Sequence, residues 1–283
     1  MRRNPIYYNE KRAFLCNYRY AGYIVLFNFI VGFISLFVYY VCFFSTKEYI
    51  TEYRSVLLIY LSIAVSEFVI LIFVIPIITA RSIAGEREKK TFDILLSTPL
   101  NPSQIIIGKL MYFLSFLMIL FISSLPIICI VTAVGGVSIT QIIQLAMVLL
   151  ATLFYIGSFG MYCSTRMNRS VRAATCTYGY VLFSLLGTFA LVIIIQILMY
   201  VSGMNLYSVY WVMFLFNPGY CLYQLLNHQT GIGYDFMTYM KYLEKCPDFL
   251  ANHWCLISCV VQVSVGLLFL LLSVRRLSRN TEV

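Results

Sequence analysis

The sequence predicts an all-α protein that crosses a membrane several times. Hydrophobic residues make up 61% of the 283-residue chain and charged residues only 11%, whereas soluble domains contain about 45–50% and about 25%. Several apolar runs are about twenty residues long, the length of helix that spans roughly 30 Å of hydrocarbon. Because backbone amides find no water inside lipid, these runs are predicted to be helices.

Six runs are long enough to cross the membrane, and they set the predicted domain organisation. The chain is expected to form a single transmembrane domain over residues 1–283. With six crossings, both termini would lie on the same side of the membrane. The spans are predicted at about 21–44, 56–79, 110–134, 142–164, 174–201 and 255–274.

The distribution of Lys and Arg predicts which side faces the cytoplasm, since short cytoplasmic loops are enriched in these residues. Sixteen of the twenty lie at the two termini, between spans two and three, or between spans four and five. Only four lie on the opposite side. Both termini are therefore predicted to be cytoplasmic.

The segment before the first span, residues 1–20, is basic and carries scattered apolar side chains. Ile6, Phe14 and Leu15 alternate with Arg and Lys, a pattern typical of a helix that lies on the membrane surface. The alternative is a basic anchor that only fixes the orientation of the first span. No signal-peptide cleavage site follows that span, so it is expected to remain in the protein.

Residues 202–254, between the last two spans, are predicted to be external. An apolar stretch at 206–226 is divided by Asn217-Pro218-Gly219 into two pieces of about ten residues, too short to cross. We expect a re-entrant pair of short helices that dips into the outer leaflet. The alternative is an ordinary external loop folded onto the bundle.

The sequence offers no pattern for catalysis. The phosphate-binding G-x-x-x-x-G-K-[ST] loop is absent, and the two histidines, His228 and His253, have no carboxylate cluster near them in sequence. Cys255 and Cys259 are four residues apart but lack the His or Asp partners of a metal site. We expect no catalytic residue, no bound cofactor and no metal in this chain.

Glu67 is the ionisable residue that lies well inside a predicted span. A charge near mid-bilayer costs about 2.5 to 3.5 kcal/mol on insertion scales, so such residues are commonly functional. Glu67, with its neighbour Ser66, is therefore a candidate for a translocation path or gate. A neutral, hydrogen-bonded contact between helices is the alternative.

The segment between spans two and three concentrates charge at one point of an apolar chain. The second span can continue as a helix through Arg81 and Ile83, since residues 84–90 hold no proline. Thr91 is predicted to cap a new helix with Asp93 in its first turn, where a carboxylate complements the helix dipole. The apolar residues of this short helix fall on one face; they are Phe92, Leu95 and Leu96.

A restart signal follows this short helix. Asn101-Pro102-Ser103-Gln104 supplies a capping residue, proline at the first helical position and Gln three residues after the cap. It begins a helix that runs into the third span. The amphipathic helix held between the two spans suits a groove on another protein, and the alternative is that it rests on lipid headgroups.

The same segment carries a resemblance to a known family. Residues 84–99, AGEREKKTFDILLSTP, followed by Gly108-Lys109, resemble the E-R/E-x-x-G-T-x-E/D-x-L-L-x-x-P…G-K signature of ABC-2 type permeases, the membrane subunits of ABC transporters. The start Asn4-Pro5-Ile6 resembles the interface helix of these permeases, especially the branch associated with multicopper enzyme maturation. Where the family has glycine before threonine this chain has Lys90, which leaves the geometry of the helix break open.

The resemblance implies a function. Residues 84–100 would form the coupling region, whose helix sits in a cleft of a separate ATP-binding subunit that holds ATP and Mg. The chain would be the permease subunit of an exporter in a prokaryotic-type cytoplasmic membrane, working as a homodimer or with a related permease. The residues expected to contact the ATPase are Glu86, Glu88, Thr91, Phe92, Leu95 and Leu96.

A second function remains open at this stage. The chain could be a membrane scaffold or channel-like protein without ATP coupling, whose basic cytoplasmic face binds anionic lipids. Membrane lipids are expected partners in either case, and nucleic acid is not. The two hypotheses differ in whether a separate ATPase with a phosphate-binding loop acts with the chain.

Overall fold

The computed structural model describes residues 18–45, 52–92, 101–133, 136–202, 212–231, 249 and 253–279. In these ranges every regular element is a helix, which confirms the predicted all-α class. Six helices are long and apolar enough to cross a membrane, so the predicted number of spans is confirmed. The predicted interfacial helix at 1–20 lies almost wholly outside the described residues.

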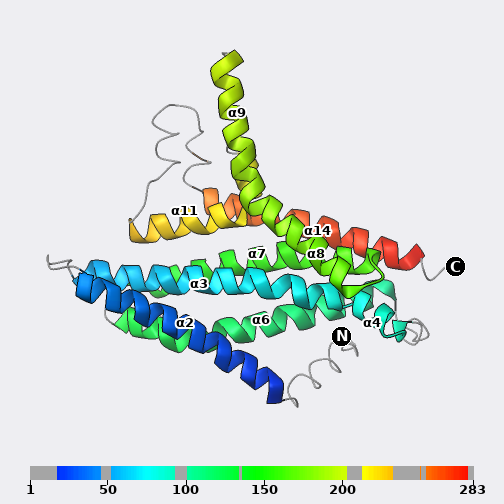
Figure 1. Ribbon diagram of the computed structural model, residues 1–283, viewed down its shortest axis with the longest axis horizontal. Coiled ribbons are helices and arrows are strands. Elements are labelled where there is room, and N and C mark those ends of the chain that lie inside the picture. Colours follow the sequence, from blue (N-terminus) through cyan, green and yellow to red (C-terminus); the bar gives the residue numbers. More distant parts are fainter. Residues whose placement is uncertain are drawn as a thin grey trace.

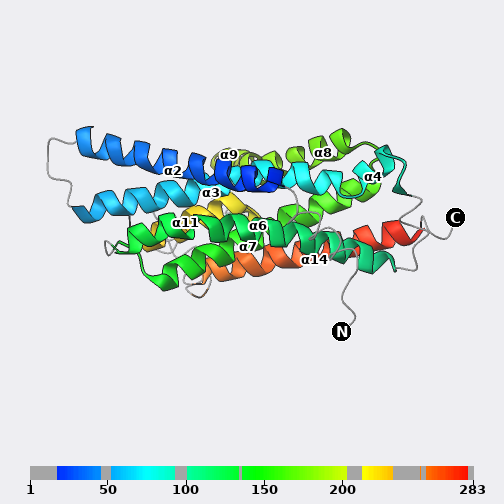
Figure 2. The same ribbon diagram turned by 90° about the horizontal axis from the view of Figure 1, so that it is seen from below.

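Five long helices run lengthwise beside one another as a bundle (Figures 1 and 2). Helix α7 is central, because it packs against α3, α6, α8 and α14. Four of these helices extend beyond the predicted spans at both ends, and α6 begins earlier than predicted but ends one residue before the predicted end. The five are α2 (Tyr18–Ser45), α3 (Glu52–Arg81), α6 (Pro102–Ala133), α7 (Ile139–Arg166) and α14 (Trp254–Arg279).

The start of α6 follows the capping signal in the sequence. The Asn101 carbonyl accepts from the Gln104 amide at 2.9 Å, and the Gln104 side chain accepts from the Asn101 amide at 3.2 Å. Proline occupies the first helical position, where its missing N–H costs nothing. The predicted restart at Asn101-Pro102-Ser103-Gln104 is therefore confirmed.

The fifth span is continuous but bent. Helix α8 (Ser170–Leu182) passes through a π-helical turn at Phe183–Gly187 into α9 (Thr188–Ser202), which leaves the bundle and points away from it (Figure 1). A π turn widens the hydrogen-bond ladder and redirects the helix. The side-chain amide of Asn217 donates to the Leu185 carbonyl in this turn at 3.1 Å, and it also donates to Thr188 Oγ1 at 2.7 Å.

The region between the last two spans contains α11 (Pro218–Thr230), which packs on α7 and α14. Asn217 caps this helix by accepting from the Tyr220 amide, so the predicted break at Asn217-Pro218-Gly219 is a helix start. At 13 residues, α11 is about 20 Å long and too short to cross. The first half of the predicted re-entrant pair falls largely outside the described residues, so that hairpin stays a prediction.

The contact between α3 and α7 is close because of one glycine. A Cβ placed on Gly160 would overlap Thr79 Oγ1 and lie 2.8 Å from Thr79 Cβ. Thr79 cannot easily move away, since its hydroxyl donates to the Ile75 carbonyl at 2.8 Å. Gly160 therefore sets the separation of the two helices close to the cytoplasmic end predicted for α3.

Replacing Gly160 with alanine should destabilise the protein. The added methyl group must push α3 and α7 apart, and overpacking of this kind costs about 1–3 kcal/mol. Gly179→Ala on α8 is the matched control, because nothing lies within 4 Å of its added Cβ. We expect a lower midpoint of thermal unfolding in detergent for Gly160→Ala alone; equal midpoints for both variants would contradict the close approach.

Candidate coupling junction

Helix α3 ends at Arg81, and the five-residue helix α4 (Ala84–Glu88) begins after the turn Ser82–Ile83. The sequence predicted an unbroken helix through Ile83, which is wrong by two residues. The Ser82 amide donates to the Thr79 carbonyl at 3.2 Å and tightens the last turn. The chain then turns into α4 at one end of the bundle, beside α8 (Figure 1).

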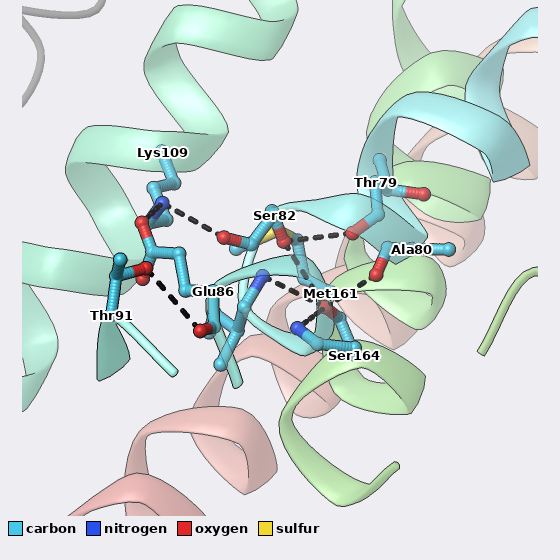
Figure 3. A network of polar contacts seen from close by, with 10 residues as sticks. Thr79, Ala80, Ser82, Glu86, Thr91, Lys109, Met161 and Ser164 are labelled. Carbon is cyan, nitrogen blue, oxygen red and sulfur yellow. Dashed lines mark hydrogen bonds and ion pairs between the residues drawn. The ribbon is translucent and has the colours of Figure 1, made fainter. Parts of the chain in front are cut away.

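A single hydroxyl from α7 holds this turn. Ser164 Oγ accepts from the amides of Ile83 and Ala84, each at 2.9 Å, and donates to the Ala80 carbonyl at 2.8 Å (Figure 3). Ser164 is fully buried. The two amides would otherwise be unsatisfied, since the first turn of a helix has no internal acceptors for them. Ser164 is thus the reason that the helix can break here without loss of hydrogen bonds.

A buried lysine from α6 joins the same turn to α4. Lys109 Nζ donates to the Ser82 carbonyl at 2.8 Å and to Glu86 Oε1 at 2.6 Å (Figure 3). The Lys109 side chain is only 4% exposed, so solvent screens this ion pair weakly. This ion pair joins the beginning and the end of the family-like motif in the sequence, because Glu86 follows Gly85 and Lys109 follows Gly108.

The second glutamate of α4 reaches a different helix. Glu88 Oε2 accepts from Ser170 Oγ at 2.5 Å and from the Ser170 amide at 3.2 Å. These bonds lower the pKa of the Glu88 carboxyl, and the nearby charges of Arg169 and Arg81 add to the effect. A carboxylate also complements the dipole at the start of α8. Helix α4 is therefore bonded to α6 through Glu86 and to α8 through Glu88.

The end of α4 explains the unusual Lys90. The Thr91 amide donates to the Glu86 carbonyl at 2.9 Å and the Lys90 amide to the Arg87 carbonyl at 3.1 Å. This pair of bonds is the Schellman arrangement, which needs a left-handed residue just past the helix. Lys90 occupies that position with φ 57°. Glycine adopts this conformation without strain, which gives a physical reason for glycine in the family motif.

Phe92 packs against the outer end of α4. The Arg87 guanidinium lies 4.7 Å from the centre of the Phe92 ring, within the range of a cation–π contact. Burial lowers the pKa of Arg87, and so does the charge of Arg276 on α14. Phe92 is thereby held against α4.

Comparison with known proteins gives the same family as the motif. The family model described as ABC-2 family transporter protein matches residues 6–274. The chain belongs to the ABC-2 transporter family. No curated protein matches it in sequence.

Within this ABC-2 transporter, the family match includes the first five spans, the junction and the sixth span up to residue 274. The chain is thus a multi-pass membrane permease, and its family implies an ABC ATP-binding partner. The family's membrane subunits are transport subunits and not themselves catalytic. Among the described residues no group of three His, Cys, Asp or Glu side chains could hold a metal.

The predicted contact residues separate into two groups in this permease. Glu86 and Glu88 face neighbouring helices, whereas Thr91 is exposed and Phe92 is half-buried. Leu95 and Leu96 lie outside the described residues, as does Asp93 of the predicted first turn. The sequence does not reveal Ser164 or Ser170, because an isolated serine carries no signal.

The candidate path residues lie far from the junction. Glu67 is fourteen residues before Arg81 in α3, about 21 Å along the helix. It is fully buried, and Ser66 is 6% exposed with its hydroxyl donating to the Ile63 carbonyl at 2.9 Å. The two regions are joined through α3 and also through α6, which carries Lys109 at the junction and Ser124 near Glu67.

Replacing Lys90 with glycine should stabilise the permease. Relief of the left-handed conformation is worth about 1 kcal/mol or slightly more. Lys89→Gly is the matched control, since it removes the same charge from a right-handed residue with φ −81°. We expect the unfolding midpoint in detergent to rise for Lys90→Gly and not for Lys89→Gly; the reverse order would contradict the Schellman end.

Proposed function

We propose that this permease works with a separate ATP-binding subunit as an exporter, and that α4 transmits movement of that subunit to the membrane helices. One observation carries the proposal: α4 and the turn before it are bonded to three other helices. The bonds come from Lys109 on α6, Ser164 on α7 and Ser170 on α8. A force on α4 would therefore act on the bundle as a whole.

The charges at the junction suit this role. The Lys109–Glu86 pair is largely buried, and truncating one partner of such a pair leaves an uncompensated charge, which is strongly destabilising. Separation of α4 from α6 is accordingly costly, so the two should move together. A loop of ordinary polar residues would absorb the movement instead.

The six predicted ATPase-coupling residues would then have two different roles. Glu86 and Glu88 would hold the permease side of the junction. Thr91, Phe92, Leu95 and Leu96 would contact the cleft of the ATP-binding subunit, with the exposed Lys89 and Lys90 beside them. ATP and Mg would be bound by that subunit.

The complete transporter would contain two permeases, either two copies of this chain or this chain and a related one. The orientation follows from the cation distribution, with both termini in the cytoplasm. The junction would then face the cytoplasm, where ATP is available. Glu67 and Ser66 would reach the translocation path only after the helices around them separate, because both are buried.

The test is loss of the ATP-binding subunit from a Phe92→Asp permease. A buried charge in place of an apolar anchor should reduce the ATPase recovered with the permease by at least about tenfold, equivalent to about 1.4 kcal/mol. The permease is solubilised from its native membranes, and co-purified proteins with a phosphate-binding loop are quantified by mass spectrometry. Phe92→Leu is the matched control and should retain the subunit.

A crosslinking experiment tests directly which residues contact the ATP-binding subunit. A photo-reactive residue at the exposed Thr91 should capture the same ATP-binding subunit, and one at Val201 on α9 should not. Undiminished recovery of the ATPase with Phe92→Asp, together with full ATP-driven activity, would contradict the assignment. A permease that captures no such subunit from either position would favour a scaffold or channel without ATP coupling.

A further inference from the structure

Glu67 is a buried carboxyl that the coupling junction does not use. It lies in the middle of α3, is fully buried, and neither of its oxygens has a hydrogen-bond partner among the described residues. Ser124 on α6 lies near it but donates to the Phe121 carbonyl at 2.8 Å. The neighbouring Ser66 donates to the Ile63 carbonyl instead. Nearby hydroxyl protons are thus directed to backbone carbonyls.

A second unpartnered acceptor lies on the helix next to it. Asn28 on α2 donates to Ser123 Oγ at 2.8 Å and to the Ile24 carbonyl at 2.9 Å, while its Oδ1 is buried without a partner. Ser123 and Ser124 are adjacent on α6, and α2, α3 and α6 pack on one another (Figure 2). The described part of this interface therefore contains more buried oxygen acceptors than donors to satisfy them.

No described cation is placed to neutralise an ionised Glu67. Lys109 of α6 is paired with Glu86 at the junction. Arg166 ends α7 and Arg172 lies in the first turn of α8, both at the junction end of the bundle. Tyr60, two turns away on α3, donates to Gln229 Oε1 on α11 at 2.8 Å. An ionised carboxylate at this place would be a buried charge without compensation.

The Glu67 carboxylate must therefore be neutralised by a bound cation, and its surroundings suit only a proton. Metal cations such as Ca²⁺ and Mg²⁺ need six or more oxygen ligands. Among the described side chains, Ser124 is the one that the structure places against the carboxyl, so the two Glu67 oxygens and this hydroxyl fall short of such a ligand set. A proton needs only one oxygen, and it converts the group to a neutral acid that can also donate a hydrogen bond.

We propose that Glu67 is a proton-binding site of the permease, occupied while α2, α3 and α6 are packed together and emptied when water enters between them. Because α3 continues into the junction, separation of these helices would be linked to ATP-driven movement. That link rests on the proposed function, whereas the bound proton does not.

The bound proton can be tested on the permease alone in lipid. Infrared spectra at neutral pH should show the C=O stretching band of a protonated carboxyl, which shifts to lower frequency in D₂O. Glu67→Gln should lack this band, and Glu86→Gln should keep it, since Glu86 is ion-paired. A wild-type spectrum without the band, or an unchanged band in Glu67→Gln, would overturn the proposal.

Three further measurements on the wild-type protein keep the proposal testable if a variant is poorly folded. In the wild-type protein, labelling glutamate with ¹³C should shift the band, and raising the pH should remove it together with part of the thermal stability. Replacing choline chloride with sodium chloride should leave the band intact. Loss of the band in sodium chloride would mean that the site binds a metal ion, which would overturn the proposal of a bound proton. Glu67→Gln should make the thermal midpoint less dependent on alkaline pH.

The link to ATP-driven movement is tested separately in the complex with the ATP-binding subunit. Glu67→Gln should alter the pH profile of ATP-driven activity, whereas Ser115→Ala at a half-buried position of α6 should not. A protonated band with identical pH profiles would overturn the link and leave the proton site standing. Absence of the complex would instead count against the proposed function.

Discussion

The hydroxyl of Ser164 is the contact on which the arrangement of the junction depends. It supplies an acceptor to two amides that a broken helix would leave unsatisfied, and it returns its own proton to the end of α3. Buried backbone groups without partners are costly, so α3 can end and α4 can begin only where such a group is available. The Lys109–Glu86 pair and the close approach at Gly160 hold α6 and α7 against the same end of α3.

Two acidic groups, Glu86 at the junction and the buried Glu67 in α3, have opposite surroundings. Glu86 accepts from Lys109 at 2.6 Å and is part of a network in which charges compensate. Glu67 is fully buried, its two oxygens have no hydrogen-bond partner among the described residues, and no described cation is placed to neutralise it. The first is suited to holding helices together, and the second to a change of charge when the packing changes. The difference lies in the neighbouring helices, not in the residue type.

Much of the fold was predictable because lipid imposes simple constraints. Apolar length determined the six spans, and local capping chemistry determined the starts of α6 and α11 at Asn101 and Asn217. The π turn before Thr188 was not predictable, because the Leu185 carbonyl in it accepts from the Asn217 side chain, thirty-two residues further along the chain. The partners of Glu86 and Glu88 were missed for the same reason.

The sequence by itself determined the class of protein, the number of spans and the motif that marks the junction, since composition and local hydrogen bonding act within a few turns of helix. It also identified Lys90 as the residue that stands where the family motif has glycine. The tertiary structure decided what these features do. It brought Lys109 to Glu86, Ser170 to Glu88 and Ser164 to the end of α3, contacts that exist only when helices distant in sequence pack together.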